Sequence, residues 1–184
     1  MLRRLIEGLF VLALLAVAGS MAAARVWPEP GYGFWWRLAE IAQMPRDSGP
    51  LDISQTPRRA SANDALVCPE RVCQKAKPDS LAPVFLVSAA ELRRKVALVA
   101  ASEPRTDELP CPAATDCARS ARFVQYSPVF LFPDTIDVTV IDAGAKASTL
   151  AIYSRSVVGF GDGGVNRQRV ERWIAALHRI IPES

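Results

Sequence analysis

The chain has 184 residues, of which 50% are hydrophobic and 22% charged, a composition that fits one globular domain and excludes a disordered chain. The formal net charge of +3 is too small and too scattered to indicate nucleic-acid binding. Because His178 is the single histidine, a catalytic zinc site that needs two histidines is excluded, and we expect no metal and no other cofactor.

An uncharged, largely apolar run spans residues 8–24, after Arg3 and Arg4. Such a run approaches the roughly 20 residues that cross a bilayer, but it also ends in small residues typical of a signal-cleavage site. Aromatic residues gather in 27–36, as at a membrane boundary, and favour a retained anchor. The sequence therefore predicts a transmembrane helix within residues 1–26, with a cleaved signal as the alternative.

The basic residues at the start of the chain predict its orientation. Positive charges stay on the cytoplasmic side, and Arg3, Arg4 and the amino terminus outnumber Arg25. We therefore expect a single-pass inner-membrane protein whose C-terminal domain lies on the periplasmic side. The alternative is a protein released into the periplasm after signal cleavage.

Residues 27–62 are expected to form an interfacial segment and a linker. Residues 45–62 are rich in Pro, Ser, Arg and Asp, and their apolar residues have no useful period, which is typical of a linker. The sequence predicts that the globular domain spans residues 63–184.

The four cysteines form two close pairs, and in an exported domain an even number of cysteines indicates disulfides. The local pairing, Cys68 with Cys73 and Cys111 with Cys117, needs the least rearrangement of the chain. A four-cysteine metal site and free thiols are the alternatives, which oxidation outside the cytoplasm disfavours.

The first predicted elements of the domain are a short strand at 84–87 and a helix directly after it. Ser88 and Glu91 have the spacing of a capping box, and Pro104 ends the helix at or before residue 103. One apolar stripe gives this helix a buried face: Leu92, Val96, Val99 and Ala100.

Three strands follow the second cysteine pair, at 122–127, 136–141 and 149–157. The last two are joined by a turn in which Gly144 supplies a positive φ, so they predict a hairpin. Sequential strands of this kind indicate an antiparallel sheet.

The chain ends in a second amphipathic helix. Asn166 is predicted to cap it, with Val165 and Val170 spaced as a hydrophobic staple. Its apolar stripe consists of Val170, Trp173, Ile174, Leu177 and Ile181. The predicted fold class is therefore α+β, with two helices on one face of an antiparallel sheet, preceded by one N-terminal transmembrane helix.

The C-terminal half resembles a known family, the domain of unknown function numbered 1499. The resemblance covers residues 63–181 and is carried by FPDTIDVTV at 132–140, by Ser154-Arg155-Ser156, by the turn at 159–162 and by the segment 165–171. It implies a small domain, often tethered to a membrane, with no assigned reaction. The two cysteine pairs depart from the family pattern.

Gly159, Gly161 and Gly164 spell GxGxxG, but no parallel strand follows, so a dinucleotide-binding fold is not indicated. The helix that begins after these glycines has free N–H groups that favour an anion. The sequence therefore predicts a ligand site that combines the helix start with nearby polar residues: Arg155, Asp162, Asn166, Arg167 and Arg169. In the alternative, Asp162 pairs with Arg155 or Arg167 and only fixes the turn.

The pattern contains no convergent catalytic set. Asp134 and Asp137, three residues apart on a strand, are expected to point to opposite faces. We therefore expect a non-enzymatic cell-envelope protein, attached to the membrane by its N-terminal segment, that binds an anionic lipid headgroup or a partner protein and no nucleic acid. The alternative is an enzyme of unknown class that uses the Arg/Asp/Asn cluster beside the glycine turn at 159–164.

Overall fold

The computed structural model describes residues 45–112 and 115–181. The predicted transmembrane segment at 1–26 lies outside the described residues, and no helix among the described ones has the length and apolar character needed to cross a membrane. The folded unit consists of residues 45–126 and 132–181.

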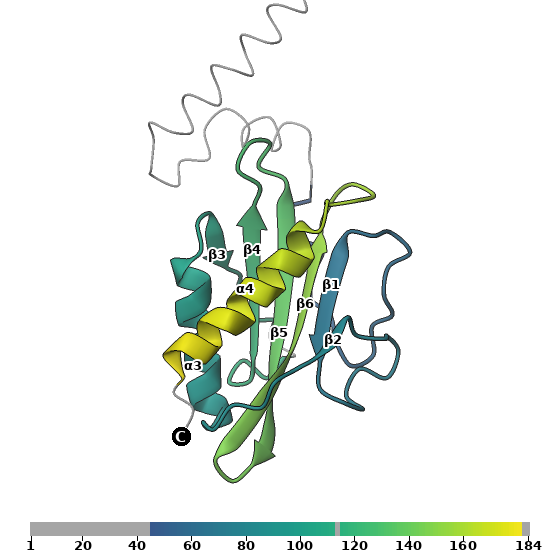
Figure 1. Ribbon diagram of the computed structural model, residues 1–184. Coiled ribbons are helices and arrows are strands. Elements are labelled where there is room, and N and C mark those ends of the chain that lie inside the picture. The colour runs from purple at the N-terminus through teal and green to yellow at the C-terminus, as the bar shows by residue number, and fades with distance from the viewer. Residues whose placement is uncertain (1–44, 113–114, 182–184) are drawn as a thin grey trace, which may run out of the picture. The chain divides into compact units, whose positions relative to one another are not determined.

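The folded unit is built on a six-stranded sheet in the order β2-β1-β6-β5-β4-β3 (Figure 1). The strands are β1 (Asp64–Cys68), β2 (Ser80–Leu81), β3 (Thr106–Glu108), β4 (Ser120–Tyr126), β5 (Pro133–Gly144) and β6 (Ala147–Ser156). The fold is α+β, as predicted.

The sheet is mixed, which corrects the prediction of a fully antiparallel one. The two-residue strand β2 pairs parallel with β1, whereas the other pairings are antiparallel. Asp79 causes this addition at the edge of the sheet, because its N–H donates to the carbonyl of Leu66 and its carboxylate accepts from the N–H of Leu66.

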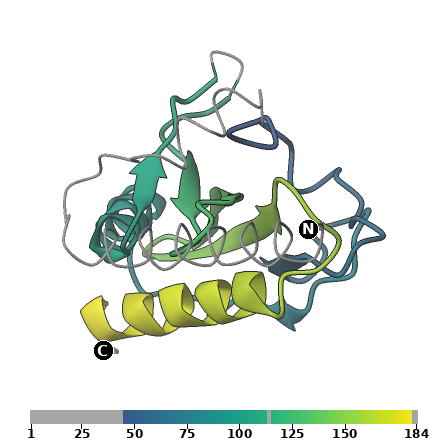
Figure 2. The ribbon, with the colours of Figure 1, turned by 90° about the horizontal axis from the view of Figure 1, so that it is seen from above.

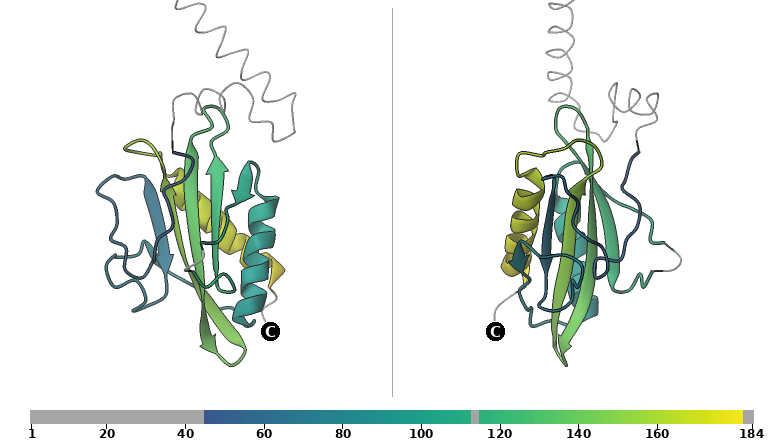
Figure 3. Two further views of the ribbon diagram at one scale, coloured as in Figure 1. Left: turned by 180° about the vertical axis from the view of Figure 1, so that it is seen from behind. Right: turned by 90° about the vertical axis from the view of Figure 1, so that its right-hand side faces the viewer.

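The helices α3 (Ala89–Ser102) and α4 (Val165–Ile180) cover the same face of the sheet (Figures 2 and 3). Both predicted apolar stripes point into the core between helices and sheet. Trp173 lies in this core, and its ring meets that of Phe123 edge-on at a centroid distance of 5.4 Å. Alternate residues of the central strands complete the core, including Ile136, Val138, Leu150 and Ile152.

The start and end of α3 follow the prediction. The hydroxyl of Ser88 accepts from the N–H of Glu91 at 3.2 Å, and the helix stops at Ser102, two residues before Pro104. The predicted strand at 84–87 is wrong, since Phe85 alone pairs there, with Ser148. Pro83 has no N–H to continue a ladder, and the cap at Ser88 turns the chain into the helix.

The hairpin of β5 and β6 is confirmed. Its strands pair from Asp134 with Ser156 to Gly144 with Ala147, and the register shifts between Asp142 and Gly144. Gly144 has a φ of 154°, a conformation that residues with a Cβ rarely adopt.

Within the segment 45–62 that is predicted to be a linker, residues 45–59 cover the face of the sheet opposite the helices. Ile53 is 3% exposed and belongs to a second core with Leu66, Ala151 and Tyr153. Periodicity could not reveal this packing because most of the segment is attached through polar groups and not through an apolar stripe. We call residues 45–59 the strap.

Both cysteine pairs form the predicted local disulfides, Cys68–Cys73 and Cys111–Cys117. Cys68 ends β1 and is fully buried in the core under the strap. Cys111 and Cys117 lie in the loop between β3 and β4, and both are exposed.

If the strap is part of the fold, Ile53→Ala should lower the free energy of unfolding by about 2–4 kcal/mol, because it empties a buried site. Leu98→Ala, at a position on α3 that is 61% exposed, should change it by no more than about 0.5 kcal/mol. Urea denaturation of both variants measures the difference. Equal losses would contradict the packing of the strap.

Candidate functional site

The start of α4 is capped by Asp162. One carboxylate oxygen accepts from the N–H of Gly164 at 2.9 Å, and the other accepts from the N–H of Asn166 at 2.8 Å. Gly164 occupies the position directly before the helix, but it has a φ of 84° and no side chain that could accept a hydrogen bond. The prediction that Asn166 caps the helix is therefore wrong. Val165 is 47% exposed, so the predicted staple to Val170 does not form either.

The protonation of Asp162 reflects this role. Burial alone would raise the pKa of its carboxyl group, but hydrogen bonds from Asn166 and Gly164 outweigh burial and hold the pKa below its ordinary value. The N–H groups predicted to bind an external anion are thus occupied by a carboxylate of the chain itself. A ligand anion would have to displace Asp162 to reach them.

Arg169 is the centre of a buried network between α4 and the sheet. It is 2% exposed and donates to the carboxylate of Asp134 at 2.6 Å, to the Asn166 carbonyl oxygen at 2.6 Å and to the Ser154 hydroxyl at 2.8 Å. Its Nε donates to the side-chain carbonyl of Gln125. Every nitrogen of this guanidinium therefore has an acceptor within the protein.

Asn166 extends this network to β6 and to the start of β1. It is fully buried, and its amide nitrogen lies 3.1 Å from the backbone carbonyl of Asn63, 3.0 Å from the Ser156 hydroxyl and 2.8 Å from the Asp162 carboxylate. The amide of Asn63 in turn donates to the carbonyl of Gly159 at 2.7 Å. The glycine turn and the first turn of α4 are thereby fixed to the sheet.

A second buried network lies on the opposite face, under the strap. Arg155 is 2% exposed, approaches the Asp137 carboxylate at 3.0 Å and donates to the carbonyl of Gly49 at 2.8 Å. Arg122 also pairs with Asp137, at 3.0 Å, and with Asp47 of the strap at 2.6 Å. The strap is therefore attached to the sheet by charge.

Burial is the largest influence on the pKa values of Asp137 and Arg155 in this second network. Burial raises the pKa of Asp137, while the nearby Arg155 and Arg122 oppose that shift. Burial likewise lowers the pKa of Arg155, and the attraction of Asp137 opposes it. The same desolvation makes the loss of either partner costly.

The five predicted ligand residues are separated by the sheet. Asp162, Asn166 and Arg169 lie together on the helix face, whereas Arg155 lies on the strap face. Arg167 is exposed and pairs with Asp79 at 3.3 Å, so neither arginine proposed as a partner of Asp162 pairs with it.

The sequence analysis missed the carboxylates that hold the buried arginines. Asp134 and Asp137 do point to opposite faces, as predicted, and they pair with different arginines. Strand alternation could have revealed the separation, because Arg155 lies between Ser154 and Ser156, whose hydroxyls face α4. Among the described residues, no three His, Cys, Asp or Glu side chains are placed to hold a metal ion.

The buried role of Arg169 predicts a large effect of its loss. Arg169→Met leaves Asp134 buried without a partner and should lower the free energy of unfolding by about 3–5 kcal/mol. Arg167→Met, two residues away on the same helix but exposed, should cost no more than about 0.5 kcal/mol. Comparable losses in urea denaturation of the two variants would contradict the network.

The depressed pKa of Asp162 predicts a pH-dependent contribution. Its stabilisation is fully present above the unfolded-state pKa, near 3.8, and is lost as the pH falls through the lower folded-state pKa. The stability difference between the natural chain and Asp162→Asn should therefore be largest near neutral pH and shrink under acid. Glu171→Gln, at an exposed position of α4, is the control. A difference independent of pH would exclude the carboxylate as the cap.

A comparison with protein-family models agrees with the resemblance carried by the C-terminal motifs. The model of DUF1499, described as a protein of unknown function, matches residues 52–177, and so includes part of the strap, the network around Arg169, the buried arginines and carboxylate of the second network, and most of α4. No curated protein matches the chain significantly. Since the match covers more than half of the sequence, the chain belongs to the DUF1499 family.

Proposed function

We propose that the chain is a non-enzymatic domain of the cell envelope, tethered to the inner membrane by its N-terminal segment, and that one end of its sheet contacts anionic lipid headgroups. Two disulfides support a location in an oxidising compartment, here the periplasmic side. Because Arg155 and Arg169 are buried, we assign the proposed contact to the exposed groups near them.

The observation that carries this proposal is the exposure of Phe160. The ring is 92% exposed and stands between Gly159 and Gly161 in the loop from β6 to α4. Scattered exposed apolar side chains are common, but a nearly fully exposed aromatic ring on a loop flanked by glycines has the form of a side chain that inserts into a lipid interface.

A second aromatic ring and two cations belong to the same end of the sheet. Phe132, 45% exposed, directly precedes β5, whose first residue accepts a backbone hydrogen bond from Val157. Arg59 donates to the carbonyl of Ser156 at the end of β6, and Arg167 is in the first turn of α4. Each exposed cation near an anionic leaflet adds about 1 kcal/mol of attraction.

The point at which the chain enters the folded unit supports a contact between this end of the sheet and the membrane. The N–H of Ser48 donates to the side-chain oxygen of Thr135 at 2.9 Å, two residues after the start of β5, and the last residue of β4, Tyr126, pairs with Pro133 at that start. The chain therefore enters the folded unit near the end that carries Phe160, and the β5–β6 hairpin marks the opposite end (Figure 1). A tether attached at this end favours its approach to the bilayer.

The alternative of an enzyme that uses the Arg/Asp/Asn cluster needs side chains that reach a substrate. Arg155, Arg169 and Asn166 are each at most 2% exposed and are bound to other groups of the protein. No specific observation favours this alternative, so we place it second.

The proposal predicts that the start of α4 is immersed in the lipid interface. An environment-sensitive dye on Val165→Cys, in the full chain reconstituted in phosphatidylglycerol-containing vesicles, should shift its emission to the blue and be quenched by spin-labelled lipid. Phe160→Ser or Arg167→Gln should weaken both signals, and pure phosphatidylcholine should give less quenching.

A dye on Leu81→Cys is the control, because Leu81 is 64% exposed but pairs with Cys68 at the opposite end of β1. It should stay in water under the same conditions. Equal quenching at positions 81 and 165, or no effect of Phe160→Ser, would refute the proposed contact.

A further inference from the structure

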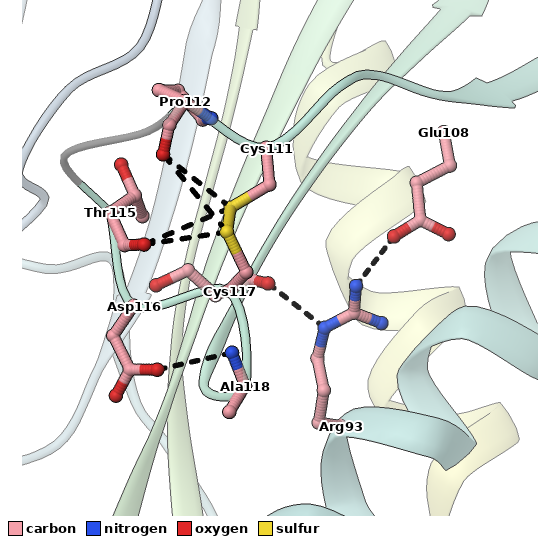
Figure 4. The surroundings of a disulfide bond; sticks show 9 residues. Arg93, Glu108, Cys111, Pro112, Thr115, Asp116, Cys117 and Ala118 are labelled. Atoms are coloured by element: carbon pink, nitrogen blue, oxygen red, sulfur yellow. Dashed lines mark hydrogen bonds and ion pairs between the residues drawn. A yellow bond between two sulfur atoms is a disulfide. The ribbon is translucent and has the colours of Figure 1, made fainter.

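The two disulfides differ in their surroundings. Cys68 is fully buried under the strap, with Cys73 partly buried against the same core. Cys111 and Cys117 are both exposed, in the loop between β3 and β4 (Figure 4). Buried structural disulfides resist reduction, whereas exposed ones are the labile and regulatory kind.

Backbone carbonyls surround the exposed sulfur atoms. The Cys117 sulfur lies 3.3 Å from the carbonyl oxygen of Thr115, and the Cys111 sulfur lies 3.8 Å from that of Pro112 (Figure 4). Sulfur atoms in a disulfide carry no hydrogen to donate. After reduction, each thiol would find an acceptor already in place. Acceptors for both thiols are therefore present among the described residues beside the two cysteines.

The flanks of this loop are held without the disulfide. Arg93 of α3 donates to the carbonyl of Ser120 at 2.9 Å and pairs with Glu108 across the loop. The N–H of Leu109 donates to the carbonyl of Arg122 at 2.8 Å, so the strands on both sides of the loop are bonded directly. Opening the Cys111–Cys117 bond should free the loop and leave the sheet intact.

We infer that Cys111–Cys117 is a thiol–disulfide exchange site that accepts two electrons from a dithiol protein, the class of oxidoreductase with two active cysteines. In the first step, a partner thiolate bonds to one of the two sulfurs and the other leaves as a thiolate, which takes a proton from water. The second partner thiol, after losing its proton, then attacks the partner's own sulfur in the mixed disulfide. The partner's disulfide forms, and the bound cysteine of the chain leaves as a thiolate, which takes a proton from water. The partner ends oxidised, and Cys111 and Cys117 end as thiols.

The first test is selective reduction of the native full chain. With limiting dithiothreitol followed by alkylation and peptide mass mapping, Cys111 and Cys117 should be labelled at least about tenfold faster than Cys68 and Cys73. The protein should keep its cooperative unfolding transition after this treatment. The Cys111→Ser/Cys117→Ser variant should also fold. This result would show that the fold does not require this disulfide, so that its reduction can be studied as a separate reaction.

The second test uses a thioredoxin-type oxidoreductase whose second active cysteine is replaced by serine, so that a mixed disulfide cannot be resolved. After alkylation, this probe should be found bound to Cys111 or Cys117 of the natural chain and should not be captured by the double-serine variant. Equal reduction rates of the two disulfides, loss of folding on reduction of Cys111–Cys117, or no capture of the probe would each overturn the inference.

Discussion

Two buried carboxylates, one on each face of β5, bind the arginines that attach the outer layers of this domain to its sheet. Asp134 binds Arg169 of α4. Asp137 binds Arg155 and Arg122, and these two arginines in turn bind the strap. A buried charge that loses its partner is far more costly than the intact pair. The register of β5 therefore determines where α4 and the strap can lie, because a shift by one residue would exchange the two carboxylates between the faces.

This constraint bears on function. Arginines near a helix start resemble an anion site in the sequence, but here the helix start is capped by Asp162 and Arg169 is enclosed by acceptors. The groups left for an external partner lie around the networks, at exposed side chains such as Phe160 and Arg167.

Features set by neighbours in sequence could be predicted: the Ser88 cap, both apolar helix stripes, the β5–β6 hairpin and both short-range disulfides. Features set by distant partners could not. The parallel edge strand depends on the hydrogen bonds between Asp79 and Leu66. The strap depends on the contacts of Asp47 and Gly49 with arginines of β4 and β6. Of the five predicted ligand residues, Asp162, Asn166 and Arg169 do lie together, but the two-residue alternation of β6 places Arg155 on the other face.

The central claim is that the buried arginines serve the fold, whereas exposed arginines such as Arg167 remain accessible to a partner surface. Reaction of the native full chain with phenylglyoxal, followed by peptide mass mapping, tests this claim for each arginine at once. The account predicts rapid modification of Arg167 and protection of Arg155 and Arg169 until the protein is unfolded. Modification of Arg155 or Arg169 as fast as Arg167 in the folded protein would contradict it.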